Sequence, residues 1–369
     1  MERPLRNVRV LEMAGLGPGP HACQLLADWG AQVVAVSRPG QPTVPVESRG
    51  KRSVVLDLRE EGAREAVLRL GERADILVEG YRPGVMERLG LGPAVMHARN
   101  PRLVYGRMTG WGQEGPWAHV AGHDINYIGL TGALHAMGRP GEPPPVPLNL
   151  VGDYGGGSMF LVGGVLAAMH RSRETGEGGV VDAAIVDGTL SIFGLMLSMA
   201  SLGTWTTARH ANMLDGGAPF YRCYETADGG YMAVGCLEPK FFARMLDLLE
   251  IAPQRYGAQN DRAEWERQGR LLAETFASRP RAQWERVFDG EDACVTPILD
   301  YEEAREHPHM KARAAVVERQ NILHPNAAPR FGGGFAVPDV PDVGADTEAV
   351  LAEVGLGPFS PPRGGGQQG

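Results

Sequence analysis

The chain has 369 residues, of which 43% are hydrophobic and 22% charged, a balance typical of a globular protein long enough for two domains. A net charge of −8 argues against a nucleic-acid-binding protein, and no uninterrupted apolar run approaches the roughly 20 residues that span a bilayer. The four cysteines form no CxxC pair or disulfide framework, and the first residues lead directly into a strand-like run without a signal-peptide segment. We therefore expect a cytoplasmic location and no membrane or nucleic-acid partner.

Strand-like apolar runs alternate with helical patterns in the first part of the chain. Strands are predicted at 8–14, 32–37, 53–58, 74–80 and 103–108, and helices at 21–29, 60–70, 123–137, 159–171 and 192–202. Such alternation predicts a mostly parallel sheet that is covered by helices on both faces. From about residue 221, short strands at 221–226 and 231–234 precede amphipathic helices at 241–249, 262–277 and 281–288, which predicts a second, α+β domain.

The glycine-rich segment 15–20 follows the first predicted strand and precedes a helix. Pro20 stands where a dinucleotide fingerprint requires its third glycine. Prolines also lack the backbone N–H groups that would hold a pyrophosphate. We therefore interpret this segment as a tight turn.

A cationic stretch is the better candidate for binding phosphate. It consists of Arg38, Arg49, Lys51, Arg52 and Arg59, joined by Arg82 and Arg88 further along the chain. Several of these residues follow predicted strands, and loops at the carboxyl ends of parallel strands commonly bind ligands. The alternative is a solvated face, although Arg82 and Arg88 stand beside glycine and proline rather than on a helix surface.

Residues that suit proton transfer at a weakly acidic carbon occur between positions 121 and 157 and again at 238. His123 and Asp153 are set among glycines and aromatic residues, and Glu238 follows much later. Such a reaction needs two bases that face each other across the substrate, each with a tunable pKa. Taken singly, His123 could be structural and Asp153 a helix cap. No metal site is predicted, since only His307 and His309 are closely spaced and they flank a proline in a predicted surface loop.

Several long segments together resemble the alpha-methylacyl-CoA racemases, a family within the class III CoA-transferase superfamily. The resemblance is carried by 15–21, 79–92, 105–112, 121–127, 147–160, 181–188, 212–220, 233–239 and 292–297. It implies that the chain inverts the α-carbon of 2-methylacyl-CoA thioesters by 1,1-proton transfer through an enolate. His123 and Asp153 would be the acid/base residues, and Glu238 the partner carboxylate of His123.

The resemblance also implies a set of residues that bind the substrate. These are Arg38, Leu56, Asp57, Leu58, Arg59, Gly80, Tyr81, Arg82, Arg88, Gly122, Asp124, Ile125, Asn126 and Tyr127. CoA would be part of the substrate, so no separate cofactor is implied. Backbone N–H groups where the predicted 123–137 helix begins are suited to an enolate oxygen.

The architecture implied by the resemblance is an α/β fold with a doubly wound, Rossmann-like large domain and a smaller α+β domain in an interlocked homodimer. The large CoA-binding domain would comprise 1–191 and 326–362, and the small domain 221–317. Residues 192–220 and 318–325 would be linkers, and 363–369 a disordered tail.

Two alternatives remain open from the residues. In a class III CoA-transferase, Asp124 would be the nucleophile that moves CoA between carboxylic acids. In a catalytically inactive acyl-CoA-binding protein, the same residues would only bind substrate. His123 before Asp124, the glycines after Asp153 and the presence of Glu238 favour the racemase.

Overall fold

The computed structural model describes residues 3–332 and 336–357, and the chain forms two compact units. The first unit comprises Met1–Thr131, Pro147–Ile192 and Ala314–Gly369, and the second comprises Gly132–Val146 and Phe193–Arg313. Residues 132–146 thus group with the second unit, whereas the sequence placed them in the large domain. The tail predicted to be disordered, 363–369, lies outside the described residues.

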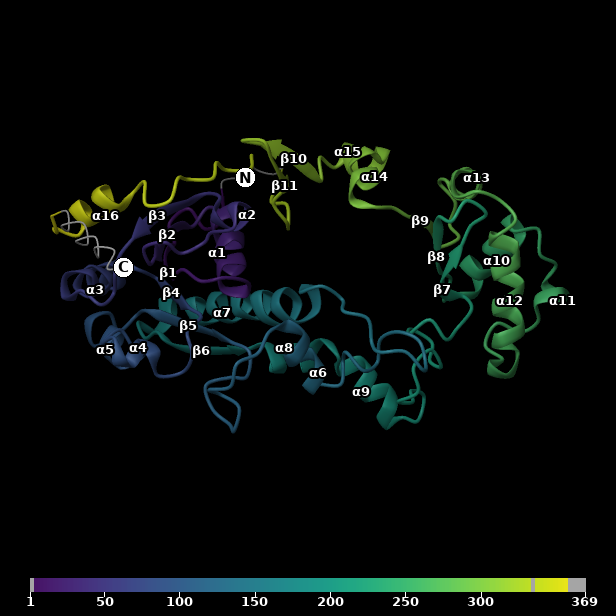
Figure 1. Ribbon diagram of the computed structural model, residues 1–369, viewed down its shortest axis with the longest axis horizontal. Coiled ribbons are helices and arrows are strands. Elements are labelled where there is room, and N and C mark those ends of the chain that lie inside the picture. Colours follow the sequence, from purple (N-terminus) through teal and green to yellow (C-terminus); the bar gives the residue numbers. More distant parts are fainter. Residues whose placement is uncertain (1–2, 333–335, 358–369) are drawn as a thin grey trace, which may run out of the picture. The chain divides into compact units, whose positions relative to one another are not determined.

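A six-stranded parallel sheet forms the centre of the first unit (Figure 1). Its strands are β1 (Arg9–Met13), β2 (Gln32–Ser37), β3 (Lys51–Val55), β4 (Ile76–Glu79), β5 (Val104–Thr109) and β6 (Gly179–Ala184). The strand order is β3-β2-β1-β4-β5-β6, so the direction of winding reverses between β1 and β4. This arrangement confirms the predicted doubly wound α/β fold and creates a switch point, the usual place for a ligand.

Both faces of this sheet are buried because successive strand residues point to opposite sides. Ile76 and Val104 face the cluster formed with α1 (Pro18–Asp28) and α7 (Met159–Thr175). Their neighbours Leu77 and Tyr105 face the opposite cluster, formed with α3 (Glu61–Arg73) and α5 (Pro93–Arg99). Figure 1 shows α1 and α7 beside one another along the sheet. The helices of this unit are α1 (Pro18–Asp28), α2 (Pro45–Ser48), α3 (Glu61–Arg73), α4 (Val85–Arg88), α5 (Pro93–Arg99), α6 (Asp124–Leu130), α7 (Met159–Thr175), α8 (Ile185–Ile192) and α16 (Thr347–Glu353).

The turn after β1 has the backbone that its glycines predict. Gly17 has φ +81°, a conformation that side chains disfavour, and Pro18 then begins α1. The tight-turn interpretation is confirmed for residues 15–17, whereas residues 18–20 form the first turn of α1, so the helix predicted at 21–29 begins three residues earlier. The predicted helix 123–137 was wrong in its length, because α6 ends at Leu130 and Gly132 follows with φ +85°.

A π-helical segment precedes α7 and was not predicted. This segment, η1 (Leu150–Ser158), contains Asp153 and runs directly into α7. Segments of this kind are rare and often occur at functional sites. The combined stretch Leu150–Thr175 is long and apolar enough to cross a membrane, but this is weak evidence because a core helix passes the same test. Leu161 and Val165 of α7 are buried against the sheet.

The second unit is built on an antiparallel sheet with the strand order β7-β8-β9. These strands, β7 (Tyr221–Glu225), β8 (Tyr231–Gly235) and β9 (Val295–Ile298), share a core with α10 (Pro239–Leu248), α12 (Trp265–Phe276) and α13 (Arg281–Phe288). Shorter elements complete it: α9 (Gly194–Ser201), α11 (Pro253–Tyr256), η2 (Arg262–Glu264), α14 (Tyr301–Glu306) and α15 (Pro308–Ala312). The predicted change to α+β secondary structure near residue 221 is confirmed.

A two-stranded antiparallel ribbon, β10 (Val316–Arg319) and β11 (Ile322–Pro325), belongs to the first unit. Residues 318–325, predicted as a linker, form much of this ribbon.

Candidate functional site

A cavity of about 220 Å³ opens at the carboxyl ends of β1, β4 and β5, beside the switch point of the sheet. The turn after β1 forms one wall, and Gly80 after β4 and Gly110 after β5 form another. His123 and Asp153 line the same cavity. The structure therefore brings together the two residues that the sequence proposed as acid and base.

Local contacts hold His123 and Asp153 at this cavity. The His123 backbone N–H donates to Asn126 Oδ1 at 3.0 Å where α6 begins. Asp153 faces the turn after β1, since a Cβ on Gly17 would lie 3.5 Å from Asp153 Oδ2. Burial and then the charge of Asp124 raise the pKa of Asp153 to about 6, against the lowering effects of Asn149 and His123. A carboxyl group with this pKa can exchange a proton readily near neutral pH.

A second hollow, of about 380 Å³, shares Gly80, Gly122, His123 and Tyr127 with the first. Tyr81, Arg82 and Asn126 also line it, so a large part of the predicted substrate-binding set meets here. Among the remaining predicted residues, Ile125 is 40% exposed and lines neither hollow.

Aromatic packing shapes the wall between these hollows. The Tyr127 hydroxyl donates to the Gly122 carbonyl, and its ring meets Trp111 edge to face with centroids 4.7 Å apart. A Cβ on Gly110 would overlap the Tyr127 ring, so this glycine permits the close approach.

An ion network centred on buried Glu79 and Arg107 supports the 80–82 loop and was not anticipated from the sequence. Glu79, 1% exposed, accepts hydrogen bonds from the Tyr81 backbone N–H at 2.8 Å and from Arg107 Nε at 2.9 Å. Arg107 also pairs with Glu87 at 2.8 Å. Burial raises the pKa of Glu79 to about 7. The sequence signal for this network was Glu79 at the end of the otherwise apolar strand β4.

The cationic stretch divides into buried and solvent-facing residues. Arg49 pairs with Asp28 at 2.6 Å and Lys51 with Glu12 at 2.6 Å, with both pairs buried, so the hypothesis that these two cations meet phosphates is wrong. Arg38 is exposed directly after β2. Within the described part of the chain, neither the Arg38 nor the Arg82 guanidinium has a hydrogen-bond or ion-pair partner.

The other predicted binding residues lie around the end of β3 and on α4. Arg52 pairs with Glu353 at 2.9 Å, and Arg59 pairs with Asp57 at 2.6 Å while its own side chain is 89% exposed. Arg88, the last residue of α4, is exposed. Leu56 is 3% exposed and packs in the core with Leu58 against it, so their side chains face the interior.

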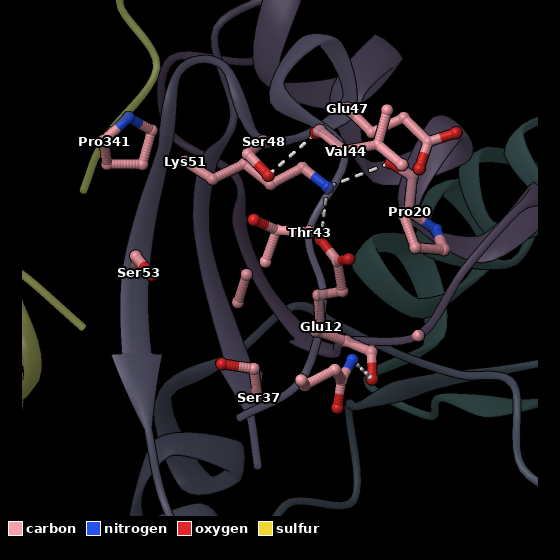
Figure 2. Close-up of a pocket in the computed structure, with 14 residues that line it drawn as sticks. Glu12, Pro20, Ser37, Thr43, Val44, Glu47, Ser48, Lys51, Ser53 and Pro341 are labelled. Atoms are coloured by element: carbon pink, nitrogen blue, oxygen red, sulfur yellow. Dashed lines mark hydrogen bonds and ion pairs between the residues drawn. The ribbon is translucent and has the colours of Figure 1, made fainter. Parts of the chain in front are cut away.

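The paired Lys51 supports the start of α1, where Pro20 borders the 220 Å³ cavity. Figure 2 shows its ammonium group between Glu12 and Pro20, with Nζ 2.9 Å from the Pro20 carbonyl oxygen. A small cavity of about 40 Å³ lies here and shares Gly15 and Pro20 with the larger one. Burial raises the pKa of both Glu12 and Glu47.

The Asp124 carboxylate is buried against η1. The residue is 6% exposed, and Oδ2 accepts the Asp153 backbone N–H at 2.7 Å. It lines neither the 220 Å³ cavity nor the 380 Å³ hollow. Asp124 therefore contacts the segment that carries Asp153.

Glu238 belongs to the second unit. It is the exposed residue directly before α10, which begins at Pro239, and follows β8 closely. Its partnership with His123 stays a prediction. Across residues 3–332 and 336–357, no group of three or more His, Cys, Asp or Glu residues could hold a metal ion.

Comparisons with known proteins define the family. The model of CoA-transferase family III matches residues 5–347, and the chain belongs to this family. It is 43% identical over 356 residues to alpha-methylacyl-CoA racemase of Mus musculus, which covers 95% of this chain and 93% of the relative. The corresponding racemase of Homo sapiens is 42% identical over 357 residues, and the match covers 95% of this chain and 94% of the relative.

A solved structure supports the fold at lower identity. The crystal structure of Rv3272 from M. tuberculosis has a TM-score of 0.79 and 27% identity, covering 94% of this chain and 99% of that chain. These findings confirm the predicted family and fold class.

Proposed function

We propose that this chain is a racemase that inverts the α-carbon of 2-methylacyl-CoA thioesters. The observation that carries the proposal is the placement of His123 and Asp153 on one cavity beside the switch point of the sheet. Sequence identity of 42–43% to two alpha-methylacyl-CoA racemases supports the substrate class.

The proposed reaction consists of two proton transfers. One residue of the pair removes the α-proton, and the C–H electrons move into the thioester to form an enolate. The other residue, already protonated, then delivers its proton to the opposite face of the α-carbon. His123 and Asp153 exchange these roles with the direction of reaction, and the pKa of Asp153 near 6 suits both roles. Overall, one proton leaves the substrate and another replaces it, without an oxidant or a second substrate.

The CoA group would extend from this cavity toward the cationic residues after β2 and β4. Arg38 and Arg82 are the two candidates for contact with its phosphates, because their guanidinium groups have no protein partner within the described part of the chain. The proposal includes Glu238 as the partner of His123, an interlocked homodimer and a cytoplasmic location. Light scattering and cell fractionation would test the last two.

The placement of Asp124 favours the racemase over a CoA-transferase. A carboxylate nucleophile must reach the thioester carbonyl carbon, whereas the Asp124 carboxylate is buried and accepts a backbone N–H. Catalytic inactivity is disfavoured by the pair of titratable residues at the cavity.

Incubation of a single epimer of a 2-methylacyl-CoA in D₂O, with no free acid added, tests the proposal. We expect both epimers to form with deuterium at the α-carbon. His123→Ala should abolish full inversion and leave exchange of the α-proton for one epimer only. Epimerisation that strictly requires an added carboxylic acid would instead identify a transferase, and binding without any exchange would identify an inactive protein.

A further inference from the structure

Asp124 is joined to the catalytic segment through a contact that the reaction scheme does not use. Its Oδ2 accepts the backbone N–H of Asp153 at 2.7 Å, and its Oδ1 is buried without a hydrogen-bond partner within the described part of the chain. A carboxylate that accepts an N–H bond away from water makes a charge-assisted hydrogen bond, which is stronger than a neutral one. The contact joins the first residue of α6 to the interior of η1.

The glycine at position 152 permits this contact. A Cβ on Gly152 would lie 2.5 Å from Asp124 Oδ2 and 2.9 Å from Ile128 on the next turn of α6. Any larger residue would therefore push η1 away from α6. The approach of these two segments brings the carboxylate of Asp124 close behind Asp153.

We propose that Asp124 is a positioning residue: its carboxylate holds the backbone of Asp153 in the π-helical segment, directs the Asp153 side chain to the cavity and places a negative charge behind it. The effect of this contact on catalysis rests on the proposed function, in which Asp153 is an acid/base residue. The hydrogen bond and the charge are properties of the folded chain that can be measured without substrate.

Several ionisable groups surround Asp153. These groups are Asp124, His123 and Tyr127 at the start of α6 and within it, Tyr154 in η1 and Glu47 in α2. The Asp124→Asn variant removes the charge of one of them and leaves the others in place. Burial is the largest cause of the raised Asp153 pKa and the Asp124 charge is the second. Removal of that charge should lower the pKa of Asp153 while burial keeps it above the ordinary value.

The test compares Asp124→Asn, Asp124→Ala and a matched control, Asp75→Asn. Asn retains the shape and an oxygen acceptor but removes the charge, whereas Ala removes the acceptor as well as the charge. Asp75 is a half-buried carboxylate that also accepts a backbone N–H, from Arg9 at 2.8 Å. Because Arg9 begins β1, this contact lies at the amino ends of the strands, opposite to the carboxyl ends where the cavity opens.

The first measurement is the titration of the Asp153 carboxyl group by ¹³C NMR, with the protein labelled at aspartate Cγ. The Asp153 signal is identified by its loss in Asp153→Asn. We expect a midpoint near pH 6 in wild type, and a midpoint in Asp124→Asn that is lower than this but above 3.8. Asp75→Asn should leave the midpoint unchanged.

The second measurement is hydrogen exchange of the Asp153 amide. Asp124→Ala should accelerate it at least about tenfold, since a lost hydrogen bond of about 1.4 kcal/mol corresponds to this factor. Asp124→Asn should restore much of the protection and most of the epimerisation rate.

An unchanged Asp153 midpoint in Asp124→Asn, or unchanged amide exchange in Asp124→Ala, would overturn the positioning role. A substrate-dependent aspartyl hydroxamate at Asp124 after hydroxylamine treatment would also overturn it, and would make Asp124 a nucleophile. If both measurements give the expected results while wild type never exchanges the α-proton, the positioning contact is supported and the proposed racemase function fails.

Discussion

Replacement of Asp153 by Asn is expected to stabilise the folded protein at neutral pH while removing racemase activity. The pKa of Asp153 is raised from 3.8 to about 6 in the folded chain, so ionisation of this carboxyl group opposes folding. Each pKa unit corresponds to 1.36 kcal/mol, which sets an upper limit of about 3 kcal/mol for the effect. Asp153 is only partly buried and solvent screens its charge, so we expect about 1–2 kcal/mol.

The sign follows from proton linkage. The folded state binds the proton more tightly than the unfolded state, so the stability that protonation contributes is fully present below pH 3.8. This stability is lost as the pH rises through about 6. The advantage of Asp153→Asn over wild type should therefore be near zero at acidic pH, grow between these two values and remain constant above them.

Urea denaturation of both proteins across this pH range measures the difference. Asp57→Asn is a control of opposite sign, because hydrogen bonds from Arg59 lower the pKa of Asp57 to about 2. That variant should lose stability at neutral pH rather than gain it. The reasoning would be refuted if Asp153→Asn were less stable than wild type at pH 7.5, or if its advantage persisted undiminished at pH 4.

Three further predictions concern binding, the core and the second unit. Arg38→Ala and Arg82→Ala should each raise KM about 10–100-fold with little change in kcat, because contacts remote from the α-carbon bind substrate and transition state alike; steady-state kinetics that show a fall in kcat at constant KM would contradict this. Arg49→Met should destabilise the fold by about 3–5 kcal/mol because it leaves the Asp28 carboxylate, 2% exposed, without its cation. In urea denaturation, a second change of Asp28 to Asn should restore most of that loss. Glu238→Gln should reduce the epimerisation rate by less than the roughly 10²–10⁴-fold expected for loss of a general base, and an equal loss would make Glu238 a direct proton carrier.

The sequence predicted the parallel sheet because β1, β2, β4 and β5 are apolar runs separated by helices, and both faces of such a sheet are buried. It did not predict η1, since a run of glycines has no helical preference of its own. Packing against α8 decides the structure there: a Cβ on Gly188 would overlap the Gly156 carbonyl. Such a contact between distant segments leaves no periodic signal.

The candidate site was predictable where residue type and family resemblance coincided, as for His123 and Asp153 at one cavity. In the cationic stretch, the sequence did not distinguish the cations that are buried in ion pairs from those that face solvent. A run of charges does not indicate which side chains face inward, and β3 begins with Lys51 directed to buried Glu12. The ion pair between Glu79 and Arg107 joins residues on adjacent strands, so it becomes visible only with the strand register.

The position of Asp124 suggests how one family fold separates two chemistries. An aspartate that attacks a thioester needs a carboxylate oxygen within reach of the carbonyl carbon. In this chain the same side chain is buried against η1 and accepts the Asp153 N–H, an approach that depends on Gly152. In the proposed positioning role, this contact holds the Asp124 carboxylate against η1 and places its charge beside Asp153, where it helps to raise the pKa of that carboxyl group. A single backbone contact would then both disfavour acyl transfer and prepare the base for α-proton exchange, so the chemistry depends on where the aspartate points as well as on its presence.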